Sequence, residues 1–137
     1  MFSFINFIPI ENKPFKRNIM SDEIQYTVEW AIKPGSLAAF KEMAESITKM
    51  VEENEPQMKG YQWYFNADGT KGYTLEWHTS SDSLLAHLQN VGDVLPNLMA
   101  HCDLSRFDVF GNPSQEAKNA LNTLGAKYFN YYAGFTR

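Results

Sequence analysis

Four stretches of the chain alternate apolar and polar side chains, a pattern typical of strands that bury one face. They cover residues 24–33, 59–66, 72–78 and 103–110. Asp68-Gly69 between the second and third stretches predicts a hairpin turn. The apolar positions of these strands define a predicted helix-side face: Tyr26, Val28, Trp30, Tyr61, Trp63, Phe65, Tyr73, Leu75, Trp77, Phe107 and Val109.

Two further stretches repeat apolar residues every three or four positions, which predicts amphipathic helices. The first follows residues 34–36, where Ser36 is expected to cap the helix, and it ends at Glu55-Pro56. Its stripe is Leu37, Phe40, Ala44, Ile47 and Val51. The second follows residues 80–82, and its later half is expected to be irregular because of Gly92 and Pro96.

The order strand-helix-strand-strand-helix-strand predicts an α+β, ferredoxin-like fold, with an antiparallel sheet covered by both helices on one face. We expect residues 21–112 to form this domain. Residues 113–137 predict a C-terminal helix followed by an extended aromatic segment, a tail that packs on the domain or on a partner. Residues 1–20 are interpreted as a flexible N-terminal extension, either a loosely held arm or one that packs on a partner subunit.

The opposite sheet face is predicted to mix charged and aromatic side chains. Its members are Thr27, Glu29, Gln62, Tyr64, Asn66, Thr74, Glu76, His78, Arg106, Asp108 and Phe110. Two such faces related by a twofold axis would complement each other, with Glu29 or Glu76 meeting Arg106 or His78. This mixture predicts a homodimer; the alternative is a monomer with a hydrated outer face.

Composition narrows the classes of function without naming one. The chain has 137 residues, of which 44% are hydrophobic, and a net charge of −4. The acidic balance argues against binding to a nucleic-acid backbone. No apolar run reaches the length needed to span a bilayer, so no membrane partner is expected. The single cysteine, Cys102, fits a reducing compartment, and we expect a cytoplasmic protein.

Three segments resemble the antibiotic biosynthesis monooxygenase family, whose members are dimeric α/β barrels. They are VEWAIKPGSLAAFKEMAESI (28–47), EPQMKGYQWYF (55–65) and GYTLEWHTSSDSLLAHL (72–88). The resemblance covers roughly residues 24–111. It implies an aromatic-lined cavity between sheet and helices, and oxidation of electron-rich phenols, quinols or anthrones by O₂ without metal or flavin. Fold alone does not fix such an activity.

His87 is the predicted catalytic residue. It lies on the buried edge of the second helix, where an imidazole can accept a phenolic proton near neutral pH. The alternative is a helix histidine that binds the strand beneath it. Glu76 and His78 share a strand face, and Glu29 is expected nearby. This cluster is either a base with its orienting group or a polar network at a dimer interface.

Trp30, Trp63 and Trp77 are the predicted substrate-binding residues, because three indoles on one face can clamp a flat aromatic ligand. Tyr73 is a further hydrogen-bond donor. The alternative is that these rings are ordinary core.

The sequence shows no spaced set of metal ligands, so neither a metal nor another cofactor is expected. Haem degradation, which the family also includes, is disfavoured because residues 24–33 lack an asparagine. Three hypotheses remain: a cofactor-independent monooxygenase acting on a small aromatic or quinol-like substrate, a non-catalytic dimeric binding module, and a structural dimer with a filled core.

Overall fold

The computed structural model describes residues 21–137. The predicted extension over residues 1–20 therefore lies outside the described residues. In chain order the elements are β1 (Ile24–Ile32), α1 (Leu37–Asn54), β2 (Gly60–Phe65), β3 (Lys71–His78), α2 (Ser81–Val91), α3 (Leu95–Met99), β4 (Cys102–Phe110), α4 (Gln115–Asn122) and β5 (Lys127–Phe129).

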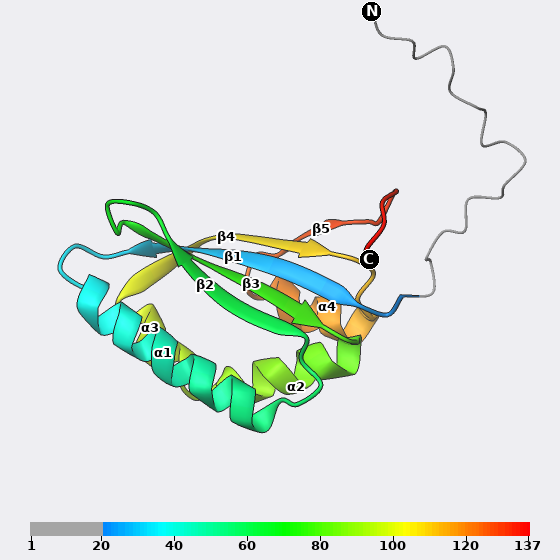
Figure 1. Cartoon of the computed structure of the whole chain (residues 1–137), viewed down its shortest axis with the longest axis horizontal. Coiled ribbons are helices and arrows are strands. Elements are labelled where there is room, and N and C mark those ends of the chain that lie inside the picture. Colours follow the sequence, from blue (N-terminus) through cyan, green and yellow to red (C-terminus); the bar gives the residue numbers. More distant parts are fainter. Residues whose placement is uncertain (1–20) are drawn as a thin grey trace, which may run out of the picture.

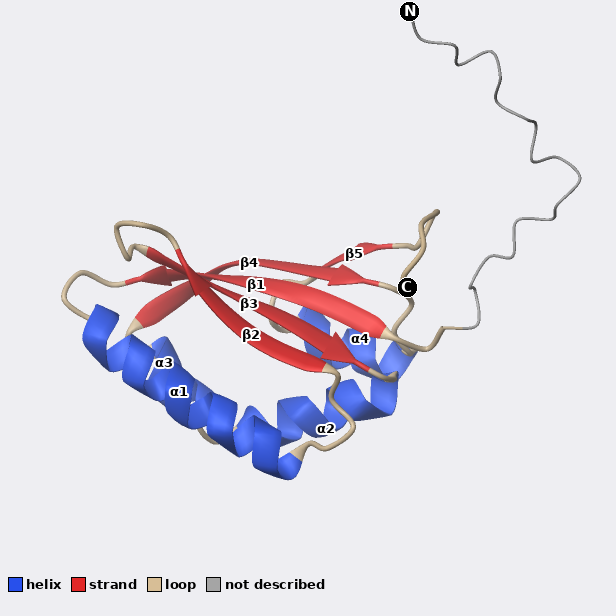
Figure 2. Cartoon of the chain, viewed as in Figure 1, coloured by secondary structure: helices blue, strands red, loops and turns tan. Residues whose placement is uncertain are grey.

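The strands form one 5-stranded sheet in the order β2-β3-β1-β4-β5, and the helices lie along one face of it (Figures 1 and 2). The pairs β2–β3, β3–β1 and β1–β4 are antiparallel, as the ferredoxin-like prediction requires. The predicted α+β, ferredoxin-like fold is confirmed. The short strand β5 adds to β4 in parallel and makes the sheet mixed.

The helices follow the predicted stripes and breaks. In α1 the residues Phe40, Ala44, Ile47 and Val51 are buried against the sheet. The hydroxyl of Ser80 caps α2 by accepting a hydrogen bond from the backbone N–H of Ser83 at 3.1 Å. The expected irregularity near Gly92 and Pro96 separates α2 from α3. Ser36 stands at the N-cap of α1, but its hydroxyl caps no backbone N–H there.

The predicted sorting of side chains is wrong for β3. Thr74, Glu76 and His78 are buried beneath the helices, whereas Tyr73 and Trp77 face the other side. Alternation has two solutions that differ by one residue, and a one-residue shift turns every side chain over. In β3 the polar residues face inward, where Glu76 pairs with His87 of α2.

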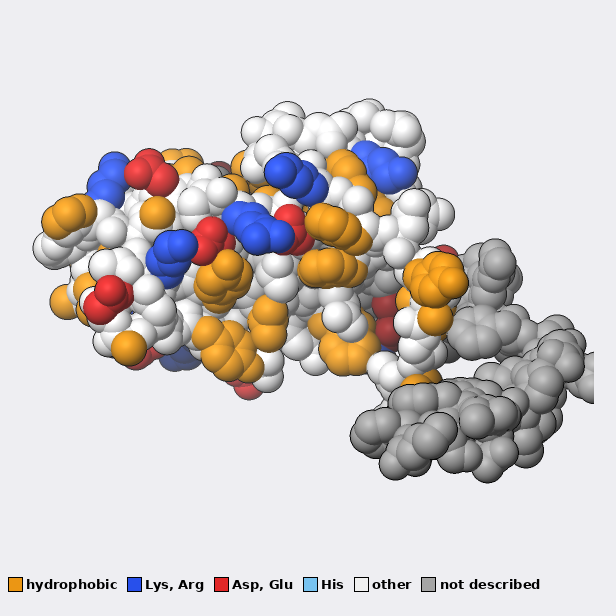
Figure 3. Space-filling view, turned by 90° about the horizontal axis from the view of Figure 1, so that it is seen from above, with side chains coloured by type: hydrophobic (Ala, Val, Ile, Leu, Met, Phe, Trp, Pro, Cys, Tyr) orange, Lys and Arg blue, Asp and Glu red, His pale blue; other side chains and the backbone are white. Residues whose placement is uncertain are grey.

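The face of the sheet away from the helices, here called the open face, carries hydrophobic side chains mixed with charged side chains of both signs (Figure 3). Glu29 lies opposite Tyr73 and pairs with Lys71 at 2.9 Å. The expected cluster of Glu29 with Glu76 and His78 is therefore wrong, because the sheet separates them. A further contact on the open face joins Nε of Arg106 to Oδ2 of Asp108 at 2.6 Å.

The segment after β4 folds back on the same chain. α4 packs against α2, and β5 pairs with the end of β4. Gly111 follows β4 directly and begins the turn toward α4 with φ 124°, and its N–H donates to the carbonyl of Phe129 at 3.0 Å. No helix within residues 21–137 has the length and apolar character needed to cross a membrane.

Candidate functional site

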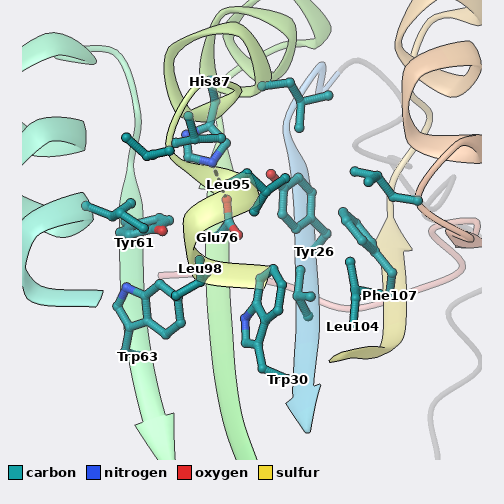
Figure 4. Close-up of a pocket in the computed structure, with 16 residues that line it drawn as sticks. Tyr26, Trp30, Tyr61, Trp63, Glu76, His87, Leu95, Leu98, Leu104 and Phe107 are labelled. Atoms are coloured by element: carbon teal, nitrogen blue, oxygen red, sulfur yellow. Dashed lines mark ion pairs between the residues drawn. The ribbon is translucent and has the colours of Figure 1, made fainter. Parts of the chain in front are cut away.

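A cavity of about 40 Å³ lies between the sheet and the helices (Figure 4). Its walls are apolar except for the Glu76–His87 pair and a few aromatic hydroxyl and indole groups. The residues that line it are Tyr26, Val28, Trp30, Ile47, Tyr61, Trp63, Glu76, His87, Leu88, Val91, Val94, Leu95, Leu98, Leu104, Phe107 and Leu124. A charged pair in such surroundings marks a candidate functional site.

Glu76 reaches the cavity because of the sheet register. On the inner face it stands opposite Tyr26 of β1 and Tyr61 of β2. Directly opposed residues share one face of a sheet, so two phenol rings flank the carboxylate. Only 6% of Glu76 is exposed to solvent. A carboxylate this deeply buried requires a positively charged partner.

That partner is His87, which α2 holds above Glu76. Nε2 of His87 lies 2.9 Å from Oε1 of Glu76, although the N–H direction does not meet hydrogen-bond geometry. Nδ1 of His87 lies 2.9 and 3.0 Å from the two carboxylate oxygens of Glu55. Asn90, one turn further along α2, donates from Nδ2 to Oε2 of Glu55 at 2.7 Å. Glu55 therefore fixes the imidazole from behind, while Glu76 faces the cavity.

The two carboxylates keep His87 charged. Burial alone would lower the pKa of His87, but the charge of Glu76 and the hydrogen bond to Glu55 raise it to about 9. Burial alone would raise the pKa of Glu76, but the charge of His87 and contacts with His78 and His87 lower it to about 2. At neutral pH the cavity wall therefore carries an imidazolium beside a carboxylate. A pKa of about 9 suits His87 to stabilising an anion, and its role as the proton acceptor stays a prediction.

The flanking phenols stay protonated in this environment. Burial, and then the charge of Glu76, raise the pKa of Tyr26 and Tyr61. Both hydroxyls can therefore act as hydrogen-bond donors toward a negative charge near Glu76.

Trp30 and Trp63 line the cavity at the end away from His87 (Figure 4). Their rings stack with centroids 6.2 Å apart and an interplanar angle of 26°. Both Nε1 atoms are buried and have no hydrogen-bond partner among residues 21–137. An unpartnered buried donor is rare in a native protein, so these two N–H groups mark a place where a ligand acceptor fits.

Of the predicted site residues, the structure brings His87, Trp30 and Trp63 to one cavity. The placement of Trp77 and Tyr73 in that slot is wrong, because both point to the open face. Nε1 of Trp77 donates to Oε2 of Glu23 at 3.3 Å, and Lys59 lies over its ring. Within the described part of the chain, no three His, Cys, Asp or Glu side chains are arranged to hold a metal ion.

No family model matches the chain, and no curated protein does. Solved structures do. MupZ from Pseudomonas fluorescens has a TM-score of 0.74 and 22% identity, covering 84% of this chain and 94% of its own. A variant of SnoaB, a cofactor-independent oxygenase from Streptomyces nogalater, has a TM-score of 0.57 and 14% identity, with coverages of 69% and 96%.

A candidate antibiotic biosynthesis monooxygenase from Caulobacter crescentus has a TM-score of 0.60 and 16% identity, with coverages of 69% and 92%. The chain has the antibiotic biosynthesis monooxygenase fold. At these identities the likeness concerns the fold and leaves the chemistry to be argued from the residues.

Within the antibiotic biosynthesis monooxygenase fold, this chain places two residues of the candidate site that its sequence does not reveal. Glu55 and Asn90 are 35 positions apart and meet only through tertiary packing. Glu55 precedes Pro56 and reads as the end of a helix. A carboxylate that is buried at a helix end needs a partner, but neither alternation nor helical spacing identifies one.

Proposed function

We propose that this protein is a cofactor-independent oxygenase of a small aromatic or quinol-like substrate, bound between the sheet and the helices. One observation supports this most: the carboxylate of Glu76 and the imidazole of His87 stand side by side in a cavity with mostly apolar walls, with pKa values of about 2 and about 9 that favour the charged form of each. Such a pair can accept a proton and hold the anion that results, with little competition from water.

Glu76 is the group that faces the substrate. Its Oε1 accepts the proton of a substrate hydroxyl, and the electron pair of that O–H bond stays on the substrate oxygen. The His87 imidazolium, held by Glu55, stabilises this oxyanion. The phenols of Tyr26 and Tyr61 are placed by the register to donate hydrogen bonds to it.

The substrate anion supplies the electrons for O₂. In an anthrone, the ring CH₂ becomes a carbonyl and loses four electrons and two protons. One atom of O₂ becomes the carbonyl oxygen, and the other leaves as water with those two protons. The protein's part is to form the anion, orient it and exclude bulk water.

Trp30 and Trp63 bind the far end of the substrate in this proposal. Their indole N–H groups donate to a carbonyl oxygen, and their rings cover the aromatic plane. The cavity of about 40 Å³ is smaller than the roughly 150 Å³ void that accommodates benzene in another protein. Substrate entry therefore requires side chains of the helical wall, Leu95 and Leu98 among them, to move outward.

The small volume of the cavity also favours a second candidate, a non-catalytic small-molecule-binding or structural protein with the same fold. In that case the Glu55–His87–Glu76 contacts hold α2 to the sheet and the end of α1, and nothing reacts.

We also propose that the protein is a cytoplasmic homodimer formed through the open face. Exposed apolar side chains, Tyr64, Leu75, Phe110 and Phe129 among them, share this face with the ion pairs of Glu29 and Asp108. A face that carries apolar groups and charges of both signs can complement a second copy of itself across a twofold axis.

The test is oxygen consumption with a panel of quinols and anthrones. We expect Glu76→Gln to lower turnover by about 10²- to 10⁴-fold, because the amide accepts no proton. Glu42→Gln is the matched control, since Glu42 is exposed on α1. Tight binding of panel members without oxygen uptake by the wild-type protein would support the binding module instead.

A further inference from the structure

His78 is a buried imidazole to which the proposed reaction assigns no role. It ends β3, two residues after Glu76, so both side chains lie on the inner face. It is fully buried, and neither ring nitrogen has a hydrogen-bond partner among the described residues. A neutral imidazole offers one donor and one acceptor, and buried polar groups of native proteins almost always use them.

The surroundings of His78 connect it to the catalytic carboxylate. Nε2 of His78 lies 3.6 Å from Oε1 of Glu76, the same oxygen that lies 2.9 Å from Nε2 of His87. The two imidazole centroids are 5.2 Å apart. The ring of Tyr26 on β1 lies 4.9 Å away and covers His78 from the neighbouring strand. Oε1 of Glu76 therefore stands between the imidazole rings of His78 and His87.

A carboxylate in this position holds a proton only weakly. The charge of His87 stabilises the ionised form of Glu76, whose pKa is about 2. His87 cannot take a second proton, because Glu55 and Glu76 keep it in the imidazolium form. The remaining proton acceptor in contact with Glu76 is the ring of His78.

We infer that His78 is the terminal acceptor of the substrate proton and that Glu76 relays it. The substrate O–H bond breaks and its proton joins Oε1 of Glu76; Glu76 then passes it to Nε2 of His78, which becomes an imidazolium. Glu76 is again a carboxylate, the substrate is an anion, and the total charge is unchanged. The groups that face this transfer are Glu76, His87 and Tyr26, with Glu55 and Tyr61 behind them. This role rests on the proposed function, since it requires a phenol-like substrate at Glu76.

The experiment uses 4-nitrophenol, whose anion absorbs visible light and whose neutral form does not, so no turnover is needed. We expect the wild-type full-length protein to bind it as the anion below the pH at which the free phenol ionises. Nitrogen NMR of the His78 ring should show that the ring gains one proton when the probe binds.

In His78→Gln we expect the ratio of ionised to neutral bound probe to fall about tenfold, equal to one pH unit of proton affinity. His78→Phe, which keeps a ring in the space, should behave in the same way. His101→Gln is the matched control, because His101 contacts Ser36 and no member of this cluster. If both His78 variants ionise the probe as well as the wild type does, or if the ring of His78 stays neutral in the complex, the inference is wrong. Failure of the wild-type protein to bind the probe would instead contradict the proposed function itself.

Discussion

His87 carries its charge because two carboxylates reach it from different parts of the chain. The same contacts make the stability of the fold depend on pH. The pKa of His87 is about 9 in the folded chain against an ordinary 6.5, so its contribution is complete below about pH 6.5 and is lost as the pH rises through 9. The pKa of Glu76 is about 2 against 4.5, so its contribution is complete above pH 4.5 and is lost as the pH falls through 2.

We therefore expect the free energy of unfolding to be greatest between about pH 4.5 and 6.5. Urea denaturation at a series of pH values measures this. His87→Gln should remove the decline above pH 6.5 and reduce the stability at pH 6 by about 3–5 kcal/mol, since it leaves Glu76 buried without its charged partner. A wild-type profile that is flat from pH 6.5 to 10 would contradict the charged state assigned to His87.

The indole N–H groups of Trp30 and Trp63 have a different signature, because they lack partners in the free protein. Trp30→Phe should change the free energy of unfolding by no more than about 1–2 kcal/mol, since no hydrogen bond is lost. It should weaken binding of 1,4-naphthoquinone by about tenfold. Calorimetric titration measures the affinity of the wild type and of the variant for the quinone.

Trp77→Phe is the matched control for this prediction, because Trp77 lies on the open face. Its binding of the quinone should equal that of the wild type. An equal loss of affinity in both variants would mean that the indoles act through the fold rather than through contact with the ligand.

The sequence predicts the candidate site only in part, for reasons that are visible at single residues. His87 is found because helical spacing places it beside buried leucines, and Trp30 and Trp63 because alternation does. Glu55 is read as a helix end, and its contact with His87 depends on how α1 lies relative to α2. No local pattern carries that information.

At the level of elements, periodicity predicts the order of the elements and which side of most of them faces inward. Every predicted strand and both main helices are present, and the break near Gly92 is where the chain kinks. The face of β3 is the exception. Its alternation is real, but both faces of this sheet carry large apolar groups, so hydrophobicity does not distinguish inward from outward.

The turn that follows β4 passes close to the backbone before β1, and a substitution at Gly111 tests how much that close approach matters for stability. Gly111 has φ 124°, and an added Cβ would lie 2.9 Å from the backbone carbonyl oxygen of Glu23. Gly111→Ala should therefore lower the free energy of unfolding by about 2–4 kcal/mol, since a backbone atom cannot easily move away. Urea denaturation provides the measurement.

Gly125→Ala separates backbone strain from this steric conflict. Gly125 also has a positive φ, of 76°, but an added Cβ there would meet nothing within 4 Å. We expect it to lose about 1 kcal/mol. If the two variants were equally stable, the close approach of Gly111 to the start of β1 would have no energetic weight.

For the molecule as a whole, the open face determines the proposed assembly. Leu75 on β3 is 40% exposed on that face, and the rings of Phe110 on β4 and Phe129 on β5 stack on each other with centroids 5.4 Å apart. Sedimentation equilibrium should give about twice the chain mass of 15.7 kDa. Leu75→Glu places an unpaired charge in the proposed interface and should shift the protein to monomers.

Ala38→Glu is the matched control for assembly, because Ala38 is exposed on α1, on the other side of the molecule. It should leave the dimer intact. A wild-type protein that sediments as a monomer at high micromolar concentration would contradict the assembly while leaving the cavity chemistry open to its own tests.

The pairing of β5 with β4 bears on how the protein resists aggregation. These three residues of β5 cover the hydrogen-bonding groups at the end of β4. A chain that stops at Gly125 would leave that end bare, and an uncovered strand recruits strands from other molecules. We expect the shortened chain to scatter light and bind amyloid dyes within days, at concentrations where the full chain stays clear. In the full chain, β5 would then prevent fibril formation at this edge.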